Sequence, residues 1–314
     1  MEPSKAFLYH SFPRRREGDV DHTKGLKILE SIFKSGLLIT PEVYKLQESL
    51  TDDSNGQEII VVQKRVCFTE ISESELADHA SHFGDITLQF ELDSLLQSGL
   101  SPVFYLPQNS QEKIWGPYGT LLTRISEVQV VLKRLEILDN MAKDPTLQEE
   151  ELILKGDSID EIHTGLRIKD MSPILSALEC GVRPFKELHG AIRSLSSLFY
   201  PMENTRYSGK LGYYRQREWR IGSDLMSNGV PLAKDLTLEE KDVLVGLDKV
   251  FYEKELRTGN GLKKIVDLSK YLRKIGDKKT SELITKIVIP ETIIPPVKEL
   301  LKKYNLDIEL AVYS

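Results

Sequence analysis

The spacing of the hydrophobic residues changes twice along this 314-residue chain, near residues 111 and 203. Outside that stretch, apolar residues gather in short β-branched or alternating runs, which are typical of strands. Between residues 111 and 203 they recur at helical spacing over long runs. The sequence therefore predicts an α+β protein, in which residues 1–110 and 204–314 form two halves of one mixed-sheet domain and residues 111–203 form a helical insert.

The first half is predicted to hold a helix that ends at a glycine and several strands. The helix has Leu26, Leu29 and Ile32 at helical spacing, and Gly36 stands where a left-handed cap residue belongs. Ser72 and Glu75 form a capping box that opens a short helix. The expected elements are a strand at 5–12, the helix at 23–35, a hairpin or one bent strand at 56–70, a half-buried strand at 85–92 and a strand at 102–106.

The remainder is predicted to be helical first and mixed afterwards. Residues 144–160 are acidic and are expected to form a solvated linker or helix face between two helices. The strands on either side of the insert are expected to complete one sheet. The expected elements are a helix at 121–141, helical structure at 174–198 that is broken near Gly181 and Pro184, a strand at 210–221, a helix at 237–247, a strand at 285–290, a helix at 296–304 and a last strand at 306–312.

Composition indicates a globular, cytoplasmic protein. Hydrophobic residues make up 40% of the chain, which is enough apolar surface to exclude a disordered class. Only two cysteines are present, so disulfides cannot hold the fold together and a reducing compartment is the natural setting. No apolar run is long enough to predict a membrane span. The net charge of -6 argues against a protein that coats nucleic acid, although a local basic face remains compatible with it.

The strand that contains Glu218 is the first candidate site. Alternation directs Trp219 and Ile221 toward the core, so Glu218 points to the other face, with Gln216 about 7 Å along the strand. A carboxylate on a rigid strand can stabilise a developing positive charge. The alternative is a surface strand with an Arg–Glu ladder.

A second candidate is the strand end at residues 66–70. Thr69 and Glu70 are placed to contact a ligand, and Phe68 could stack on a flat ring. Strand ends that bind no ligand often carry the same kinds of residue, so an ordinary strand end is the alternative interpretation. Cys67 lies between apolar residues and is expected to be a small core residue rather than a nucleophile.

Histidines and basic residues supply weaker signals. His10 ends an apolar strand and is followed by Ser11, so both could contact a ligand; a satisfied core histidine is the alternative. His79 and His82 have helical metal-ligand spacing but lack further ligands, so no metal site is expected. Basic residues could hold phosphates if they share a face, or could simply be solvated; they are Arg14, Arg15, Arg16, Arg206, Lys210, Arg215, Arg217 and Arg220.

The order of these pieces resembles that of a known family. The chain has strand-end His10, a helix with the run Leu26, Ile28, Leu29, Gly36 and Leu37, then residues 66–70, then residues 82–84, and finally residues 216–220. That series resembles the AbiGi-like abortive phage resistance family and, more remotely, the DarT toxins, both of which look like members of the ADP-ribosyltransferase superfamily. The resemblance covers about residues 5–107 and 205–312.

The resemblance implies an ADP-ribosyltransferase-like split mixed sheet and NAD as a substrate. Cleavage of the nicotinamide–ribose bond passes through an oxocarbenium-like state that a carboxylate can stabilise. By resemblance, the catalytic residues are Glu218, His10 and Gln216, and the residues that contact NAD are His10, Ser11, Phe68, Thr69, Glu70, His82 and Tyr214. Phe68-Thr69-Glu70 stands where a Ser-Thr-Ser-like segment is typical, so a diverged or inactive pocket is the alternative.

The leading functional hypothesis is an NAD-consuming ADP-ribosyltransferase effector of abortive infection that modifies a macromolecule, with nucleic acid as the favoured acceptor. The alternative is a non-catalytic antitoxin or sensor that binds a partner protein, such as a cognate toxin, through the scaffold and the helical insert. A third reading is an RNA-cleaving toxin that uses His10 and His82 as acid and base. A shared pocket requires Glu218 to lie within about 12 Å of His10 or Thr69, because direct contacts need hydrogen-bond reach.

Overall fold

The computed structural model describes residues 6–13, 22–46, 59–106, 117–156, 159–179, 184–201, 217–227, 230–258 and 261–313. Within the chain, contacts define two compact units: Met1–Thr120 with Ser194–Ser314 (unit 1), and Leu121–Arg193 (unit 2). The domain borders expected from the sequence, at 110/111 and 203/204, lie outside the described residues.

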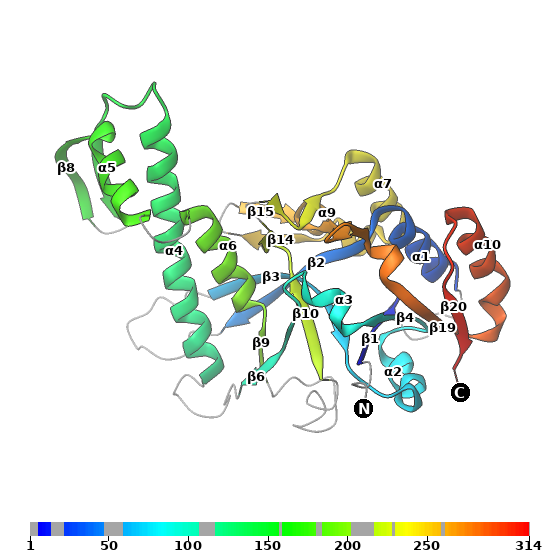
Figure 1. The fold of residues 1–314 in the computed structure, drawn as a ribbon. Coiled ribbons are helices and arrows are strands. Elements are labelled where there is room, and N and C mark those ends of the chain that lie inside the picture. Colours follow the sequence, from blue (N-terminus) through cyan, green and yellow to red (C-terminus); the bar gives the residue numbers. More distant parts are fainter. Residues whose placement is uncertain are drawn as a thin grey trace. The chain divides into compact units, whose positions relative to one another are not determined.

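Unit 1 is built on a ten-stranded mixed sheet (Figure 1). Its main path runs in the order β13-β16-β2-β3-β1-β4-β19-β20, with β10 paired to β3 and β5 paired to β10. The pairs are antiparallel except for β19 with β20. The strands are β1 (Phe7–Phe12), β2 (Leu37–Leu46), β3 (Ile59–Thr69), β4 (Ile86–Glu91), β5 (Ser101–Pro102), β10 (Glu218–Gly222), β13 (Ala233–Asp235), β16 (Lys270–Leu272), β19 (Ile284–Ile289) and β20 (Glu309–Val312).

The sheet joins strands from both sides of unit 2, which confirms that the flanking segments complete one sheet. It also splits at β3. Arg65 pairs with Thr40 of β2 and with Gly222 of β10, so these two strands lie on opposite edges of β3. Thr69 likewise pairs with β1 on one edge and β10 on the other. β1 and β2 therefore share one edge of β3, and the sheet divides between them.

Two strands differ from the sequence-based expectation. β2 was not predicted, and it pairs along Thr40–Leu46 with β3, which is one long strand rather than a hairpin. β4 was expected to be half-buried, yet Thr87 and Gln89 on its second face are as buried as its apolar residues. β4 lies between β1 and β19 in the sheet, and both of its faces are buried.

Helices α1 (Thr23–Ser35) and α10 (Ile294–Tyr304) lie side by side against the sheet (Figure 1). Leu29 and Ile32 of α1 and Val297 of α10 belong to the main core with Phe68, Leu88 and other strand residues. Gly36 ends α1 with a φ of 102°, and a Cβ there would approach Leu272 O to 2.3 Å. Only glycine fits this turn, as the sequence predicted.

The other helices of unit 1 are α2 (Leu76–Phe83), α3 (Leu92–Leu96), α7 (Leu238–Leu247), α8 (Lys249–Tyr252) and α9 (Ile265–Leu268). α7 begins at a capping box of Thr237 and Glu240, which confirms the predicted helix at 237–247. With α8, α9 and neighbouring strands it surrounds a second core that contains Tyr252 and Tyr271. Short strand pairs complete the unit: β6 (Phe104–Leu106) with β9 (Phe199–Pro201), β11 (Met226–Ser227) with β12 (Val230–Pro231), β14 (Glu255–Thr258) with β15 (Gly261–Lys264), and β17 (Lys274–Ile275) with β18 (Lys278–Lys279).

Unit 2 contains helices and one hairpin. Its elements are most of α4 (Pro117–Lys143), β7 (Glu151–Gly156), β8 (Ile159–Arg167), α5 (Ile168–Glu179) and most of α6 (Phe185–Ser196). Leu132, Ile168 and Leu175 form part of its own core. The acidic stretch at 144–160 was predicted to be a linker or helix face. Residues 144–150 form turns, which agrees with a linker, whereas 151–156 form β7 and 159–160 begin β8. Apolar residues such as Ile153 and Leu154 pair across the hairpin, but the prediction was based on the number of acidic residues in the stretch and did not take them into account.

Candidate functional site

The three motifs singled out in the sequence lie on three adjacent strands. Tyr9 of β1 pairs with Thr69 of β3, and Thr69 pairs on its other edge with Glu218 of β10. Cα atoms of such directly opposed residues are about 4.5–5.5 Å apart. The distance required for a shared pocket is therefore met between Glu218 and Thr69.

His10 and Glu218 nevertheless lie on opposite faces of the sheet. The ring of His10 lies 5.7 Å from that of Phe68 and 5.8 Å from that of Phe12, so His10 is on the core face. Its Nδ1 is 2.8 Å from Cys67 O, at the point where β1 and β3 separate. Thr69 and Glu218 alternate with Phe68 and Trp219 and point the other way. The structure does not bring His10 and Glu218 into one pocket.

Glu218 is buried in an ion pair. Its carboxylate accepts hydrogen bonds from Arg220 Nε at 2.9 Å and Arg220 Nη2 at 3.2 Å, and from Tyr105 OH at 3.4 Å. The side chain of Arg220 is 0% exposed and that of Glu218 is 10% exposed. Burial by itself raises the pKa of Glu218, but the charge and hydrogen bonds of Arg220 hold that pKa below its usual value. In this structure the carboxylate of Glu218 is an ionised group whose hydrogen bonds come from within the protein.

A second buried cation extends this network. Arg65 donates to Gln63 Oε1 and to Glu42 Oε2, and Gln63 Nε2 donates to Ser196 O at 2.6 Å. The ring of Tyr200 lies 4.8 Å from the guanidinium carbon of Arg220 and 5.7 Å from that of Arg65. Arg220 Nη1 donates to Ser197 O at 2.6 Å. Arg220 was among the basic residues considered as phosphate ligands. In this structure its side chain is fully buried and donates its hydrogen bonds to Glu218 and Ser197.

His79 is a site residue that sequence reasoning missed. Its Nε2 lies 3.1 Å from Thr69 Oγ1 and its Nδ1 lies 3.2 Å from Ser11 Oγ. Ser11 Oγ continues the chain to Thr87 Oγ1 at 2.7 Å, and Thr87 continues it to Tyr313 OH at 2.8 Å. The signal was present in the sequence: the Ser72 capping box starts a helix whose inward face holds Leu76, His79 and Ala80.

Burial lowers the pKa of His79 to about 4, with further lowering by the charges of His82 and His10. The imidazole is therefore neutral at physiological pH, and it joins α2 to β1 and β3 through two hydroxyl groups. Its chemistry is that of a structural hydrogen-bond bridge between Ser11 and Thr69.

The other predicted residues are dispersed. Phe68, proposed to stack on a ligand, is fully buried in this structure and packs edge-on against Phe90. Glu70 accepts a hydrogen bond from Trp219 Nε1 at 3.0 Å. His82 is exposed on α2, where Nδ1 lies 3.1 Å from Asp78 O. Gln216, Tyr214, Arg206, Lys210, Arg215 and Arg14–Arg16 lie outside the described residues.

Cys67 is partly exposed and does not belong to the hydrophobic core. Burial of the thiol, followed by the nearby charge of Glu218, raises its pKa to about 11. The thiol is therefore almost wholly protonated at neutral pH and is a poor nucleophile.

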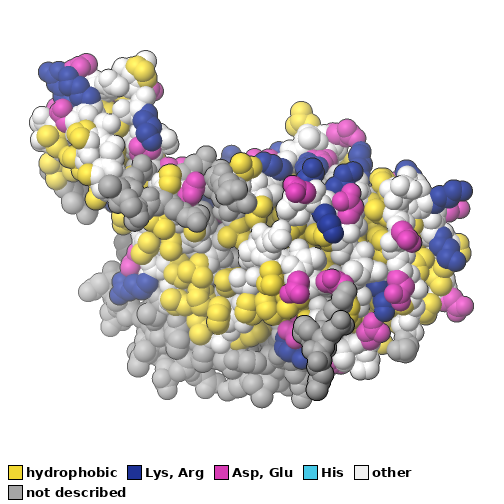
Figure 2. All heavy atoms as spheres, viewed as in Figure 1, with side chains coloured by type: hydrophobic (Ala, Val, Ile, Leu, Met, Phe, Trp, Pro, Cys, Tyr) yellow, Lys and Arg dark blue, Asp and Glu magenta, His cyan; other side chains and the backbone are white. Residues whose placement is uncertain are grey.

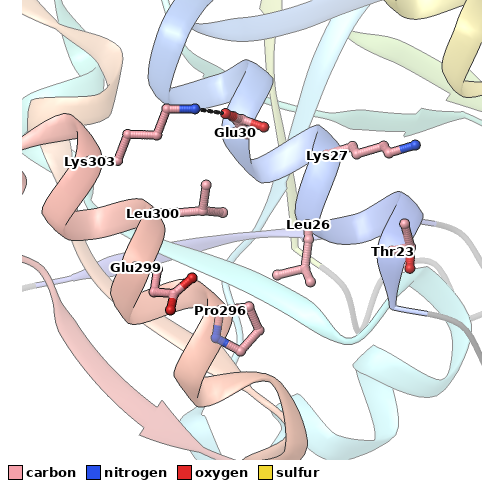
Figure 3. A pocket seen from close by; sticks show the side chains of 8 residues that line it. All are labelled: Thr23, Leu26, Lys27, Glu30, Pro296, Glu299, Leu300 and Lys303. Carbon is pink, nitrogen blue, oxygen red and sulfur yellow. Dashed lines mark hydrogen bonds and ion pairs between the residues drawn. The ribbon is translucent and has the colours of Figure 1, made fainter.

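A hollow of about 300 Å³ lies elsewhere in unit 1, between α1 and α10 (Figure 3). Leu26, Pro296 and Leu300 line it, and Lys303 Nζ crosses it to Glu30 at 2.6 Å. None of the predicted site residues lines this hollow. Among the described residues no three His, Cys, Asp or Glu side chains converge as metal ligands would, and no helix in this part of the chain is both long and apolar enough to cross a membrane.

Comparison with known proteins gives one result. A family model described as "Putative abortive phage resistance protein AbiGi, antitoxin" matches residues 42–244, about two thirds of the 314 residues. The chain belongs to the AbiGi family. The matched range includes the second half of β2, all of β3 and β10, and all of unit 2. No curated protein and no solved structure matches the chain.

Proposed function

We propose that this protein is a non-catalytic antitoxin of an abortive phage resistance system and that it acts by binding a partner protein in the cytoplasm. The observation that carries the proposal is the state of Glu218, whose carboxylate is occupied by Arg220 and Tyr105 and faces away from His10. A carboxylate held this way is not available to the ribose of a substrate. The family description, which includes the word antitoxin, supports the same conclusion.

Unit 2 offers the surface for the partner. Val130, Val131 and Ile137 on α4 are 45–56% exposed. On the hairpin, Leu154 and Ile162 are cross-strand partners, and each is 49% exposed. Exposed apolar side chains gathered in one small unit are typical of a protein-binding surface.

Growth of cells that carry the protein with its cognate toxin tests the proposal. The wild type and Glu218→Gln should both permit growth, because the glutamine keeps an acceptor for Arg220 and no catalysis is needed. Leu154→Ser with Ile162→Ser should lose protection, whereas Leu238→Ser, at an 80% exposed leucine of unit 1, should keep it. Nicotinamide release from NAD by the wild type, abolished in Glu218→Gln, would contradict the antitoxin assignment.

The second candidate is an ADP-ribosyltransferase, with an ADP-ribosyltransferase-like sheet, NAD as substrate and nucleic acid as acceptor. One observation favours it: β1, β3 and β10 are adjacent, with Tyr9, Thr69 and Glu218 in lateral register. These are the three strands on which the superfamily's motifs were expected. For this activity Glu218 must leave Arg220 and face the substrate.

Labelled NAD separates the two candidates. The folded protein is incubated with labelled NAD and with separate protein, DNA and RNA pools. Label in any pool, lost in Glu218→Gln, supports the transferase and identifies the acceptor. Absence of label together with absence of nicotinamide release supports the antitoxin.

A further inference from the structure

Positive charge is concentrated in one segment of an otherwise acidic chain. From Lys249 to Lys279 the sequence has ten Lys and Arg against four Asp and Glu, while the rest of the chain has 32 against 44. The segment folds as α8, the β14–β15 hairpin, α9, β16 and the β17–β18 hairpin. In Figure 2, Lys and Arg side chains lie interspersed with Asp and Glu side chains over the part of unit 1 where Figure 1 labels β15, α9 and α7.

Some of these cations have acidic partners and the rest do not. Lys249 and Lys264 pair with Glu253, Lys270 with Asp224 and Asp235, and Arg273 with Glu240. The remaining six are exposed and form no ion pair with any residue in the described part of the chain. They are Lys254, Arg257 and Lys263 at the β14–β15 hairpin, and Lys274, Lys278 and Lys279 at the β17–β18 hairpin.

The β17–β18 hairpin holds like charges against one another. Lys274 and Lys279 are direct cross-strand partners, and Lys278 faces Ile275. Like charges placed directly opposite each other destabilise a strand pair. Gly276, with a φ of +59°, permits the tight turn that brings them together. A bound anion would relieve this repulsion.

We propose that the two hairpins form a lysine surface that binds the phosphate backbone of a nucleic acid. The unpaired cations stand on two hairpins that α9 and β16 separate along the chain, which suits a ligand with repeated charges better than a single phosphate. The described strands of these hairpins carry no aromatic side chain. Of the aromatic residues beside them, Tyr252 and Tyr271 are buried, whereas Phe251 of α8 is 37% exposed and packs edge-on against Tyr252. Contacts to phosphates without base stacking make the binding independent of sequence. This surface is independent of Glu218 and of the proposed antitoxin role.

Fluorescence anisotropy with the full chain tests this surface. The probes are a labelled 20-base-pair DNA, a 20-nucleotide RNA of mixed sequence and phosphatidylserine vesicles, each titrated between 50 and 200 mM salt. The test variant is Lys274→Gln, Lys278→Gln and Lys279→Gln combined. The matched control is Lys27→Gln, Lys298→Gln and Lys302→Gln, which removes three exposed lysines from α1 and α10 and gives the same net charge.

The wild type should bind the nucleic acids, with an affinity for DNA that falls about 10³-fold over this salt range if six cations are engaged. The hairpin variant should lower the log–log salt slope for DNA by about 2.7, since each lost phosphate contact contributes about 0.9. The control should keep the wild-type slope. Equal weakening in both variants, the absence of nucleic-acid binding, or binding confined to vesicles would each overturn the assignment.

Discussion

Removal of the Glu218 carboxylate should destabilise the whole of unit 1. In Glu218→Ala, the guanidinium of Arg220 stays fully buried and retains Ser197 O and the Tyr200 ring but loses its counter-ion. Leaving one partner of a buried ion pair unpaired costs about 3–5 kcal/mol. That is a large part of the free energy of unfolding of a typical domain, about 5–15 kcal/mol.

A double-mutant cycle gives the coupling between the two residues. Urea unfolding is measured for the wild type, Glu218→Ala, Arg220→Met and the double variant. The double variant should be less destabilised than the sum of the single variants, with a coupling energy of about 2–3 kcal/mol, because it leaves no buried charge behind. Glu218→Gln should cost about 1.5–3 kcal/mol, since it removes a charged acceptor but keeps the shape.

A loss below about 1 kcal/mol in Glu218→Ala would refute the reasoning, because it would mean that Arg220 does not depend on this carboxylate. The same measurement affects how functional assays are read. An alanine at position 218 that abolishes phage protection could act through unfolding alone. Glu218→Gln, with its stability measured in parallel, is therefore the variant that reports on chemistry.

Two further predictions concern single residues of unit 1. The pKa of His79 is lower in the folded protein than in the unfolded chain, so as the pH falls the unfolded chain binds a proton at His79 before the folded protein does. The stability that neutral His79 contributes is therefore present above about pH 6.5 and is lost as the pH falls toward 4. Urea unfolding of the wild type and of His79→Asn measures this loss. Between pH 7 and pH 4, the unfolding free energy of the wild type should fall by about 3 kcal/mol relative to that of His79→Asn. A difference between the two proteins that stays constant with pH would show that His79 is not buried in its neutral form. Gly36→Ala should lower the unfolding free energy by about 3 kcal/mol, because it combines a positive φ with a Cβ that would lie 2.3 Å from Leu272 O. Gly246→Ala in α7, where no atom lies within 4 Å of the added Cβ, should be neutral or stabilising, and equal thermal shifts in the two variants would contradict the steric account.

Local patterns predicted much of the secondary structure. The helix at 23–35 and its terminal glycine, the capped helix after Ser72, the helix at 237–247 and the long helix that contains residues 121–141 all appear where the sequence pattern placed them. The acidic hairpin of unit 2 was missed because its charged residues opposed the strand signal, and the pairing of β7 with β8 decided the outcome. Strand β2 was missed although Ile39, Val43 and Tyr44 favour a strand; Pro41 interrupts it, and pairing with β3 decided the outcome.

The candidate site was predicted less well than the fold. The sequence identified Thr69 and Glu218, and the sheet places them side by side. It did not reveal that Tyr105 of β6 hydrogen-bonds to Glu218 or that the ring of Tyr200 of β9 contacts Arg220, although both tyrosines lie in unit 1. It also did not identify His79 as the partner of Ser11 and Thr69, because that contact joins a helix to two strands distant in the chain.

The sequence by itself determined most of the helices, several of the strands, and which of those strands carry the notable polar residues. These properties depend largely on neighbours within a few residues, where periodicity, capping and turn preference act. Only the tertiary structure decided which face each side chain occupies and what covers that face. It paired Glu218 with Arg220 and separated it from His10, because burial and charge pairing depend on contacts between distant segments.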